Sequence, residues 1–467
     1  MMKRRTRKAD VVGFALIAAV AIGLTTSARG ENVGSAAPDS AAPALAQPES
    51  PRYDDWFTDA AMRVDLFHTG IASENVYSLD DIVREPSWPG TRRYLIDPFD
   101  YGTYRFRVMD AASSREIFRM GYSTLFEEWT GTDEAVQGIR RSMSESVRFP
   151  WPKKPVSLAI DRRQRDGKFQ HVYTLAIDPA SHQINRAQRY GEFEVVELVE
   201  GPPPDRALDV VILPEGYTRQ DAEKLKADFE RFADRLVNLE PFKSNRARLH
   251  VRGVMAYSRE SGVTEPRKGV FKDTLLGAAF NTFDSPRYLT LLHTKVMREV
   301  ASLAPYDNVF VMVNTSRYGG GGVYNQWSVF TSDNEYDDYV MLHEFGHHMG
   351  GLGDEYYNSA MTMDEDALYP PGTEPWEPNI TAFLGNERKN IKWNSMIAAQ
   401  TPVPTPESEQ FASTVGLFEG AGYKAKGLYR PQEDCKMFHK GLVPFCAVCT
   451  KSLEAMMHYY TGEELTR

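Results

Sequence analysis

Short runs in which apolar and polar residues alternate characterise the first part of the chain, a spacing typical of half-buried β-strands. Residues 104–108 (YRFRV) and 156–160 (VSLAI) are two examples. Residues 126–148 are the one stretch in this region whose pattern fits a helix. We therefore predict an all-β domain, a β-sandwich, over residues 52–200. The pattern does not distinguish a supporting role for this domain from a role in holding substrate.

The pattern changes beyond residues 201–204 (GPPP), a stiff linker because proline fixes φ and removes a backbone donor. Continuous apolar runs then alternate with segments of helical periodicity, which predicts an α/β domain over residues 205–467. The run at 309–313 (VFVMV) is unbroken, so we expect this strand to be buried on both faces. Strands are predicted at 207–213, 249–257 and 309–313, and helices at 219–236 and 288–304.

Length and charge narrow the class of protein. The 467 residues exceed one usual hydrophobic core and favour two domains. A formal net charge of −10 argues against a nucleic-acid binder, because phosphate neutralisation needs clustered basic residues. Hydrophobic residues make up 42% of the chain, which is enough for packed cores and argues against disorder.

The amino terminus has the features of an export signal. A basic segment precedes an apolar run at residues 11–24, and small residues follow it. The run is shorter than the ~20 residues of a spanning helix, so we predict a cleaved signal peptide over residues 1–28 and not an anchor. Residues 29–51, rich in Ala, Pro and Ser, predict a flexible linker. We expect the mature protein in the periplasm or outside the cell, without a stable membrane span.

The α/β domain is organised around the segment VMLHEFGHHMGGLGDEYY, residues 340–357, which contains the pattern H-E-x-x-H. On an α-helix, residues four apart share a face, so His343 and His347 point into the same space and can bind one Zn²⁺. Glu344 lies beside this metal and can take a proton from the zinc-bound water, whose pKa falls to about 7. The alternative is a surface helix whose two histidines only contact each other.

The residues after the motif argue against that alternative. Gly350, Gly351 and Gly353 allow the chain to turn sharply, and an acidic pair then returns toward the helix end. A third ligand is needed there, with the fourth zinc position left open for water. We favour Asp354 as this ligand, with Glu355 as the competitor.

Four consecutive glycines precede the motif, at residues 319–322. No Lys-Ser or Lys-Thr pair follows them, so a phosphate-binding loop is excluded. One interpretation is a flexible loop. The other is a strand edge without side chains, where an extended peptide can approach and pair by β-augmentation. On this second interpretation, Gly320, Gly321 and Gly322 are the candidate substrate-binding residues.

The three cysteines of the chain, Cys435, Cys446 and Cys449, lie near its end. In an exported protein they favour a disulfide from Cys435 to one of the other two, which leaves one free thiol. A second zinc site that includes His439 has workable spacing and is the alternative. A redox-active C-x-x-C is disfavoured, because no thioredoxin-like βαβ unit precedes it.

Several motifs together resemble the igalysin metallopeptidases, a family named for a clostridial protease that cuts immunoglobulin A. They are HEFGHHMGGLGDEYY, the glycine run, FEGAGY, CKM followed by FCAVC and, upstream, WPGTRRYLIDPFDYGTYRFRVMD. The resemblance covers nearly the whole mature chain. It implies a metzincin-like catalytic domain with a methionine turn beneath the zinc, a role that falls on Met437. The general metzincin pattern has its third ligand where this chain has Gly353, which cannot ligate; Asp354 stays favoured and Glu355 open.

We therefore predict an exported zinc endopeptidase that hydrolyses protein or peptide substrates, with Zn²⁺ polarising the scissile carbonyl and Glu344 as general base. Tyr356, Tyr357 and Tyr423 are candidates to stabilise the oxyanion. Two alternatives are a zinc hydrolase of non-peptide amides, such as those of cell walls, and a binding module with a vestigial zinc site. Immunoglobulin A specificity does not carry over, because subsite loops determine it.

Overall fold

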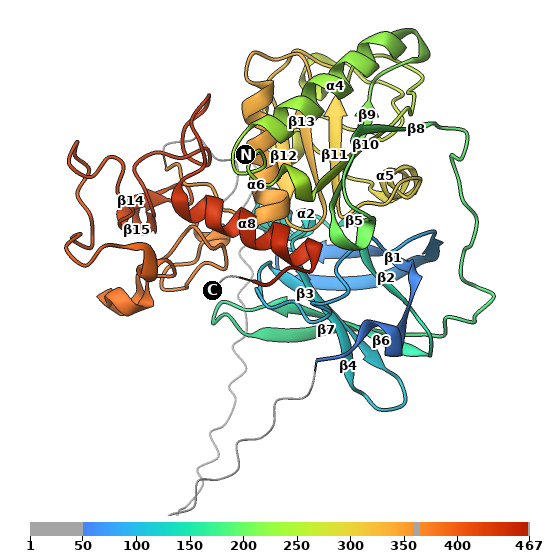
Figure 1. The fold of residues 1–467 in the computed structure, drawn as a ribbon, viewed down its shortest axis with the longest axis horizontal. Coiled ribbons are helices and arrows are strands. Elements are labelled where there is room, and N and C mark those ends of the chain that lie inside the picture. Colours follow the sequence, from blue (N-terminus) through green and yellow to red (C-terminus); the bar gives the residue numbers. More distant parts are fainter. Residues whose placement is uncertain (1–49, 358–364, 466–467) are drawn as a thin grey trace, which may run out of the picture. The chain divides into compact units, whose positions relative to one another are not determined.

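A computed structural model describes residues 50–357 and 365–465 of the chain (Figure 1). The predicted signal peptide, residues 1–28, and the predicted linker as far as residue 49 lie outside the described residues. Ser50–Arg467 forms one unit. None of the helices in the described part of the chain is long and apolar enough to cross a membrane.

Two antiparallel sheets form the amino-terminal region, in agreement with the predicted all-β domain, with strand orders β2-β1-β5 and β4-β3-β6-β7. After the short helix α1 (Tyr53–Trp56), the strands are β1 Phe57–Ile71, β2 Glu74–Glu85, β3 Tyr104–Asp110, β4 Glu116–Tyr122, β5 Arg141–Pro152, β6 Val156–Arg163 and β7 Phe169–Ile177. Strand β3 buries alternate residues, as its sequence pattern predicted. Its Phe106 and Val108 pack with Val64 of β1 and Phe149 of β5, so the two sheets share one core.

The helix predicted over residues 126–148 is only partly present. Helices α2 (Leu125–Thr130) and α3 (Asp133–Val136) occupy its first part, and the rest belongs to strand β5. The hydroxyl oxygen of Thr132 accepts a hydrogen bond from the Ala135 N–H and starts a new helix after α2. Strand β5 pairs along β1, and this long-range pairing overrides the local helical pattern.

The second domain contains a six-stranded sheet of order β12-β13-β11-β9-β10-β8. Its strands are β8 Val195–Val199, β9 Leu208–Glu215, β10 Leu249–Val254, β11 Asn308–Val313, β12 Gly320–Val323 and β13 Trp327–Thr331. The four inner strands are parallel, and the two outer strands are antiparallel to their neighbours. Every residue of β9, β10 and β11 is buried, as predicted for β11 from its unbroken apolar run.

Helices pack on both faces of this sheet (Figure 1). Helices α4 (Ala222–Asn238), α6 (Asp337–Gly350) and α8 (Ala447–Thr461) share a core with one face, and α5 (Lys295–Ala301) packs on the other. Helix α5 is shorter than the helix predicted at residues 288–304, because Tyr288 and Thr290 form β-bridges instead. The remaining elements are α7 Glu365–Leu368, the hairpin β14 Phe418–Ala421 and β15 Lys424–Arg430, and 3₁₀ turns at Pro204–Arg206, Arg219–Asp221, Arg246–Arg248, Pro266–Lys268, Thr282–Asp284, Leu384–Asn386, Arg388–Asn390 and Asn394–Met396.

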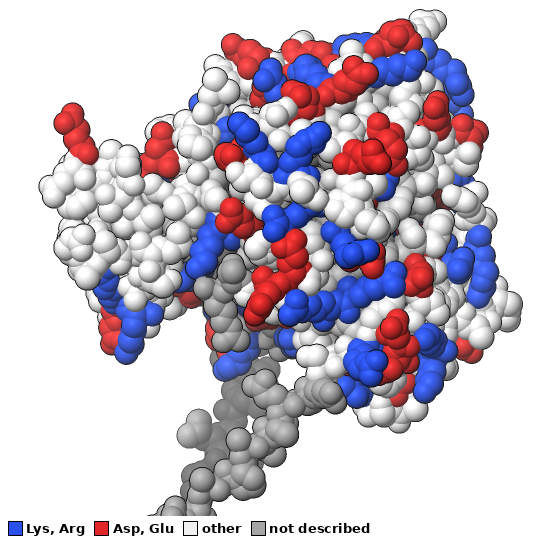
Figure 2. Space-filling view, in the orientation of Figure 1, with Lys and Arg blue, Asp and Glu red and all other residues white. Residues whose placement is uncertain are grey.

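Ion pairs connect α4 to the start of α6. Arg231 of α4 lies 2.7 Å from a carboxylate oxygen of Asp337, and Arg235 lies 3.2 Å from one of Asp338. Both aspartates are in the first turn of α6, where negative charge is favourable to the helix dipole. On the face of the molecule shown in Figure 2, basic and acidic side chains are interspersed.

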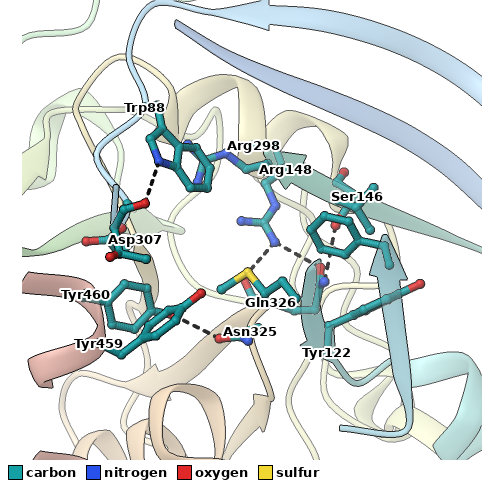
Figure 3. A pocket seen from close by; sticks show the side chains of 15 residues that line it. Trp88, Tyr122, Ser146, Arg148, Arg298, Asp307, Asn325, Gln326, Tyr459 and Tyr460 are labelled. Atoms are coloured by element: carbon teal, nitrogen blue, oxygen red, sulfur yellow. Dashed lines mark hydrogen bonds between the residues drawn. The ribbon is translucent and has the colours of Figure 1, made fainter. Parts of the chain in front are cut away.

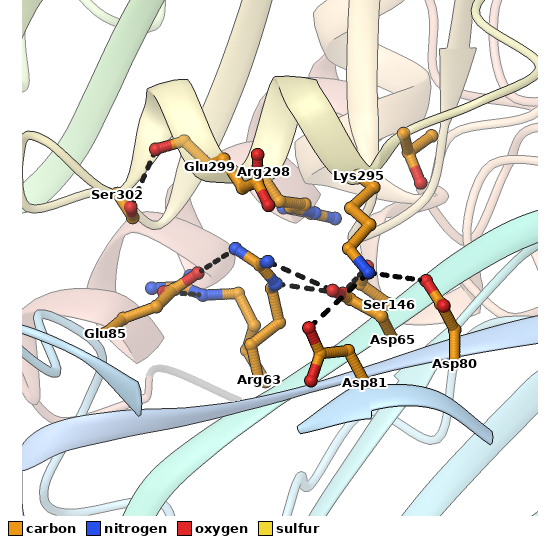
Figure 4. A network of polar contacts seen from close by, with 12 residues as sticks. Arg63, Asp65, Asp80, Asp81, Glu85, Ser146, Lys295, Arg298, Glu299 and Ser302 are labelled. Atoms are coloured by element: carbon orange, nitrogen blue, oxygen red, sulfur yellow. Dashed lines mark hydrogen bonds and ion pairs between the residues drawn. The ribbon is translucent and has the colours of Figure 1, made fainter. Parts of the chain in front are cut away.

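Ion pairs join the three-stranded sheet to Lys295 of helix α5, and buried charges join it to the segment that follows α5 (Figure 4). Arg63 of β1 donates to Asp65 (2.8 Å) and to Glu85 (3.0 Å), and Arg148 of β5 donates to the other carboxylate oxygen of Glu85 (2.8 Å). Arg148 also lies over the ring of Tyr306, 3.6 Å from its centre. Burial opposes ionisation of Glu85, but Arg148 and Arg63 outweigh it and hold the pKa of Glu85 below its usual value.

A cavity of about 40 Å³ lies near this network, lined by residues of both domains (Figure 3). The side-chain amide of Gln326 donates to the backbone carbonyl of Ser146 (3.3 Å), and Arg298 donates to the side-chain oxygen of Gln326 (3.0 Å). Tyr460 of α8 donates to the side-chain oxygen of Asn325 (3.0 Å). A direct hydrogen bond from Gln326 thus attaches strand β5 to the loop between β12 and β13.

Substituting Glu85→Ala should lower the free energy of unfolding by about 3–5 kcal/mol, because Arg63 and Arg148 would stay buried without a carboxylate partner. The control is Glu74→Ala on the same strand: the Glu74 side chain is 51% exposed and that of Glu85 only 2%. The control should change stability by less than about 1 kcal/mol. Urea unfolding of both variants checks this, and equal midpoints would contradict a stabilising network.

Candidate metal centre

Helix α6 ends in a left-handed turn that sends the chain back along the helix. Gly351 has φ of 60° and ψ of 25°, a conformation that side chains disfavour. Its N–H donates to the His347 carbonyl (3.1 Å), and the Leu352 N–H donates to the Gly346 carbonyl (3.1 Å). The first of these bonds is that of the αL type of helix end, with Gly351 as its left-handed residue.

The other two glycines that were predicted to make this turn serve packing instead. A Cβ atom at Gly350 would lie 2.8 Å from Leu453 of α8, and one at Gly353 would lie 2.5 Å from Ile380. Neither glycine has a positive φ. The turn therefore depends on Gly351 alone, and the neighbouring glycines allow α8 and the loop around residue 380 to approach closely.

The turn brings Asp354 to the two histidines of α6. The Nε2 atoms of His343 and His347 lie 3.3 Å apart, and Asp354 Oδ1 lies 3.1 Å from the first and 3.3 Å from the second. A tetrahedral metal ~2.0–2.2 Å from three N and O ligands needs them roughly 3.3–3.5 Å apart. The three atoms form a triangle of nearly this size.

The second ring nitrogen of each histidine faces a backbone carbonyl. His343 Nδ1 lies 3.2 Å from the Lys436 carbonyl oxygen, and His347 Nδ1 lies 2.6 Å from that of Leu352. A nitrogen that donates to a carbonyl must carry the proton, which leaves a lone pair on Nε2. In their neutral forms, both imidazoles would thus present Nε2 to a metal.

Asp354 and Glu355 point to different neighbours. Asp354 Oδ2 accepts a hydrogen bond from Tyr423, while Oδ1 is buried and has no hydrogen-bond donor in the described part of the chain. Burial opposes ionisation of Asp354, but His347 and His343 outweigh it and hold its pKa well below the usual range. A buried carboxylate oxygen that faces both Nε2 atoms fits a metal ligand. Glu355 Oε1 instead lies 2.9 Å from the side-chain nitrogen of Asn379.

Strand β12, which contains the three candidate glycines, runs beside α6 at the edge of the sheet. A Cβ atom at Gly320 would lie 2.7 Å from Glu344 Oε1, and one at Gly322 would lie 2.3 Å from the Glu344 carbonyl oxygen. The absence of side chains therefore allows the helix to approach the strand. The Leu289 N–H already donates to the Gly320 carbonyl (3.3 Å), so part of this edge is paired within the chain.

A cavity of about 460 Å³ opens at these residues. His343, His347, Asp354, Glu344 and the glycines of β12 line it, as do residues of the amino-terminal domain, among them Thr124, Glu127 and Glu128 of α2 and its cap.

Glu128 is one of the lining residues that sequence reasoning missed. Its carboxylate accepts a hydrogen bond from Tyr288 (2.5 Å), and burial raises its pKa to about 7. No local pattern distinguishes Glu128 from Glu127, because its position depends on contact between the two domains. Sequence reasoning also missed Arg287, which lines the same cavity.

The turn at Met437 lies beneath α6. A Cβ atom at Gly346 would lie 2.9 Å from Met437 Sδ, and the Met437 carbonyl accepts a hydrogen bond from the Glu355 N–H (2.9 Å). Two of the three candidate tyrosines, Tyr356 and Tyr423, line the cavity. The ring of Tyr357 instead packs against that of Phe438, with 5.8 Å between ring centres.

The predicted disulfide is wrong in this structure, because Cys435, Cys446 and Cys449 are all free and buried. The alternative set of four ligands also differs from the structure: His439 bonds to Asp434 (2.6 Å) at the surface. Local spacing suggested His439, but the side chain that meets the cysteines comes from a segment about 80 residues earlier.

Comparisons with known proteins support a peptidase. The family model described as IgA Peptidase M64 matches residues 196–411 and 407–457, which together span more than half of the chain. The model described as Peptidase M64 N-terminus matches residues 52–174. No curated protein matches the chain.

Replacing Asp354 with alanine should lower the affinity for the metal of this site by roughly 100-fold or more, since even changes outside the ligands cost 10–100-fold. Metal content after dialysis should fall by about one ion per chain, as measured by mass spectrometry of the elements. Glu419→Ala is the control, because Glu419 is exposed on the β14–β15 hairpin. Unchanged metal content in the Asp354 variant would contradict its role.

Proposed function

Because the chain belongs to the IgA peptidase M64 family, we propose that it is a zinc-dependent endopeptidase that acts on protein or peptide substrates. The observation that carries the proposal is the triangle of ligand atoms from His343, His347 and Asp354 at the wall of an open cavity. Two imidazoles and one carboxylate are a ligand set of catalytic zinc, which keeps one position for the reaction. A turn of the metzincin type beneath the site, at Met437, is part of this proposal.

When bound by these three residues, zinc supplies a Lewis acid that polarises the scissile carbonyl and acidifies water. Glu344 lies one residue after His343 on the same helix and lines the cavity. We assign it the transfer of a proton from the attacking water to the leaving amine. Burial raises the pKa of Glu344, with His343 and His347 opposing, and a raised pKa suits a base that must later return its proton.

We propose Tyr356 or Tyr423 as the oxyanion donor, because both line the cavity. The single hydroxyl hydrogen of Tyr423 is donated to Asp354, so Tyr423 would have to release that bond to serve the substrate. The ring centre of Tyr356 lies 6.4 Å from that of His343. A phenol at the edge of the metal site is placed to donate to negative charge that develops on the substrate carbonyl oxygen.

We propose that an extended substrate lies between strand β12 and helix α2. Gly321 and Gly322 belong to the part of the β12 edge beyond the Leu289 hydrogen bond, and α2 lines the same cavity from the other domain. On this view the amino-terminal domain holds substrate as well as supporting the catalytic domain. Export stays a prediction from residues 1–28, which cell fractionation would test.

The function is tested by incubating the purified protein with a diverse peptide library and, separately, with cell-wall fragments. Each reaction is run with and without a zinc chelator, followed by return of zinc. The proposal predicts internal cleavage of peptides that the chelator stops and zinc restores. Cleavage of cell-wall amides alone would indicate a zinc amidase, and cleavage of neither would favour a binding module.

Glu344→Gln should keep the zinc content of the wild type but lower kcat by roughly 10²–10⁴-fold, because the amide cannot accept the proton from water. Glu335→Gln is the matched control, since Glu335 is exposed just before the same helix. Peptide cleavage and metal content are measured on both variants. Full activity in the Glu344 variant would rule out its role as general base.

Glu128→Ala should lower kcat/KM for peptides about tenfold, if the carboxylate bonds to substrate, and leave zinc content unchanged. Glu134→Ala is the control, because Glu134 lies on α3 and forms an ion pair with Arg141 at the surface. Equal kcat/KM values for wild type and the Glu128 variant would show that this wall does not bind substrate.

A further inference from the structure

A second group of potential metal ligands lies next to the histidine site. It consists of four buried side chains: Cys435, Cys446, Cys449 and Glu355. One ligand atom from each lies within 4.8 Å of all the others. Nothing in the peptidase chemistry of the histidine site uses these groups.

The distances between these atoms are those of a tetrahedral metal site. Zinc–sulfur and zinc–oxygen bonds of ~2.3 and ~2.0 Å place two sulfurs roughly 3.8 Å apart, and a sulfur and an oxygen roughly 3.5 Å apart. Cys435 Sγ lies 3.8 Å from Cys449 Sγ. Glu355 Oε1 lies 3.1 Å from Cys449 Sγ and 3.8 Å from Cys446 Sγ. A disulfide needs its sulfurs ~2.05 Å apart, so this spacing suits a shared cation.

Backbone N–H groups surround the sulfurs. Those of Cys446 (3.2 Å) and Met437 (3.4 Å) donate to Cys435 Sγ, and that of Cys449 (3.4 Å) donates to Cys446 Sγ. Cys446 is the N-cap of the 15-residue helix α8, so the positive end of the helix dipole faces its sulfur. Donors and dipole both stabilise thiolates, the form that binds metals.

Glu355 cannot be explained as ordinary core packing. Buried free cysteines behave as small apolar side chains, but a buried carboxylate is costly unless it is paired. The contacts of Glu355 Oε1 are with Asn379 and two cysteines, none of which carries a positive charge. Its Oε2 atom is buried without a hydrogen-bond partner in the described part of the chain. A cation among these four groups would balance the charge of this carboxylate.

We propose that Cys435, Cys446, Cys449 and Glu355 bind a structural zinc ion, separate from the one at the histidine site. Three sulfurs and one carboxylate favour zinc over magnesium or calcium, which prefer oxygen ligands. With four protein ligands the site is closed, as structural zinc sites are. The bound ion also protects the thiols from oxidation, which accounts for free cysteines in a chain predicted to be exported.

This ion would join three segments that build the histidine site. Glu355 follows Asp354, Cys435 precedes Lys436, whose carbonyl faces His343, and Cys446 begins α8. The second zinc is thus placed to hold the third ligand and one histidine partner in position. The inference does not depend on peptidase activity, because a structural metal would be present whatever the substrate.

Metal counting on the full chain, purified with zinc and without reductant, tests the proposal. We expect about two zinc ions per chain in the wild type and one in His343→Ala, which removes only the first site. Cys449→Ser and Glu355→Gln should each lose the second ion. His439→Ala, the control at a nearby exposed residue, should keep both. One ion in the wild type and none in His343→Ala would overturn the proposal.

Two measurements that need no cysteine variant keep the test decisive if those variants do not fold. Cobalt(II) exchanged into His343→Ala should show a thiolate-to-cobalt charge-transfer band, because three sulfurs remain to bind it. Thiol titration of the denatured wild type, without reductant, should find three free thiols. Absence of the band, or a single thiol that indicates a disulfide, would exclude the site.

Discussion

The contact between Asp354 and the paired imidazoles of His343 and His347 is the interaction on which the other features of the site depend. Besides the hydrogen bond from Tyr423, this deeply buried carboxylate is stabilised by the neighbouring nitrogens or by a cation that all three residues share. The Gly351 turn places Asp354 beside the imidazoles, and a backbone carbonyl oxygen faces the Nδ1 atom of each ring. The turn from Gly351 to Asp354 is therefore needed both to end helix α6 and to assemble the three candidate ligands.

The site also requires that the backbones of helix α6 and strand β12 lie close together. Helix α6 contacts strand β12 across glycines whose Cβ atoms would collide with Glu344 and its backbone, and Gly346 leaves space for Met437. The same lack of side chains opens the cavity wall where we propose that substrate pairs. The glycine run, which the sequence suggested as a substrate-binding edge, is thus also needed for packing. A larger residue at Gly320 or Gly322 would disturb the packing of α6 and the proposed substrate edge.

The site is shared among segments that are distant in sequence. Helix α2 of the amino-terminal domain lines the cavity, and buried ion pairs around Glu85 attach that domain to the segment after α5. On the other side, Glu355 and the three cysteines link the Asp354 segment to helix α8. The Glu85 cluster thus connects the two domains, and the cysteine cluster connects α8 to the segment of Asp354, which lines the cavity.

The sequence by itself determined the order of β-rich and α/β regions, the helical pairing of His343 with His347, and the family, because these follow from local periodicity and spacing. Only the tertiary structure placed Asp354 beside the two imidazoles and Glu355 beside the cysteines, since neighbouring carboxylates are equivalent until the Gly351 turn orients them. It also replaced His439 with Glu355 beside the cysteines, turned residues 141–148 into a strand, and brought Glu128 to the cavity. Each of these depends on contacts across long stretches of chain, which local patterns do not encode.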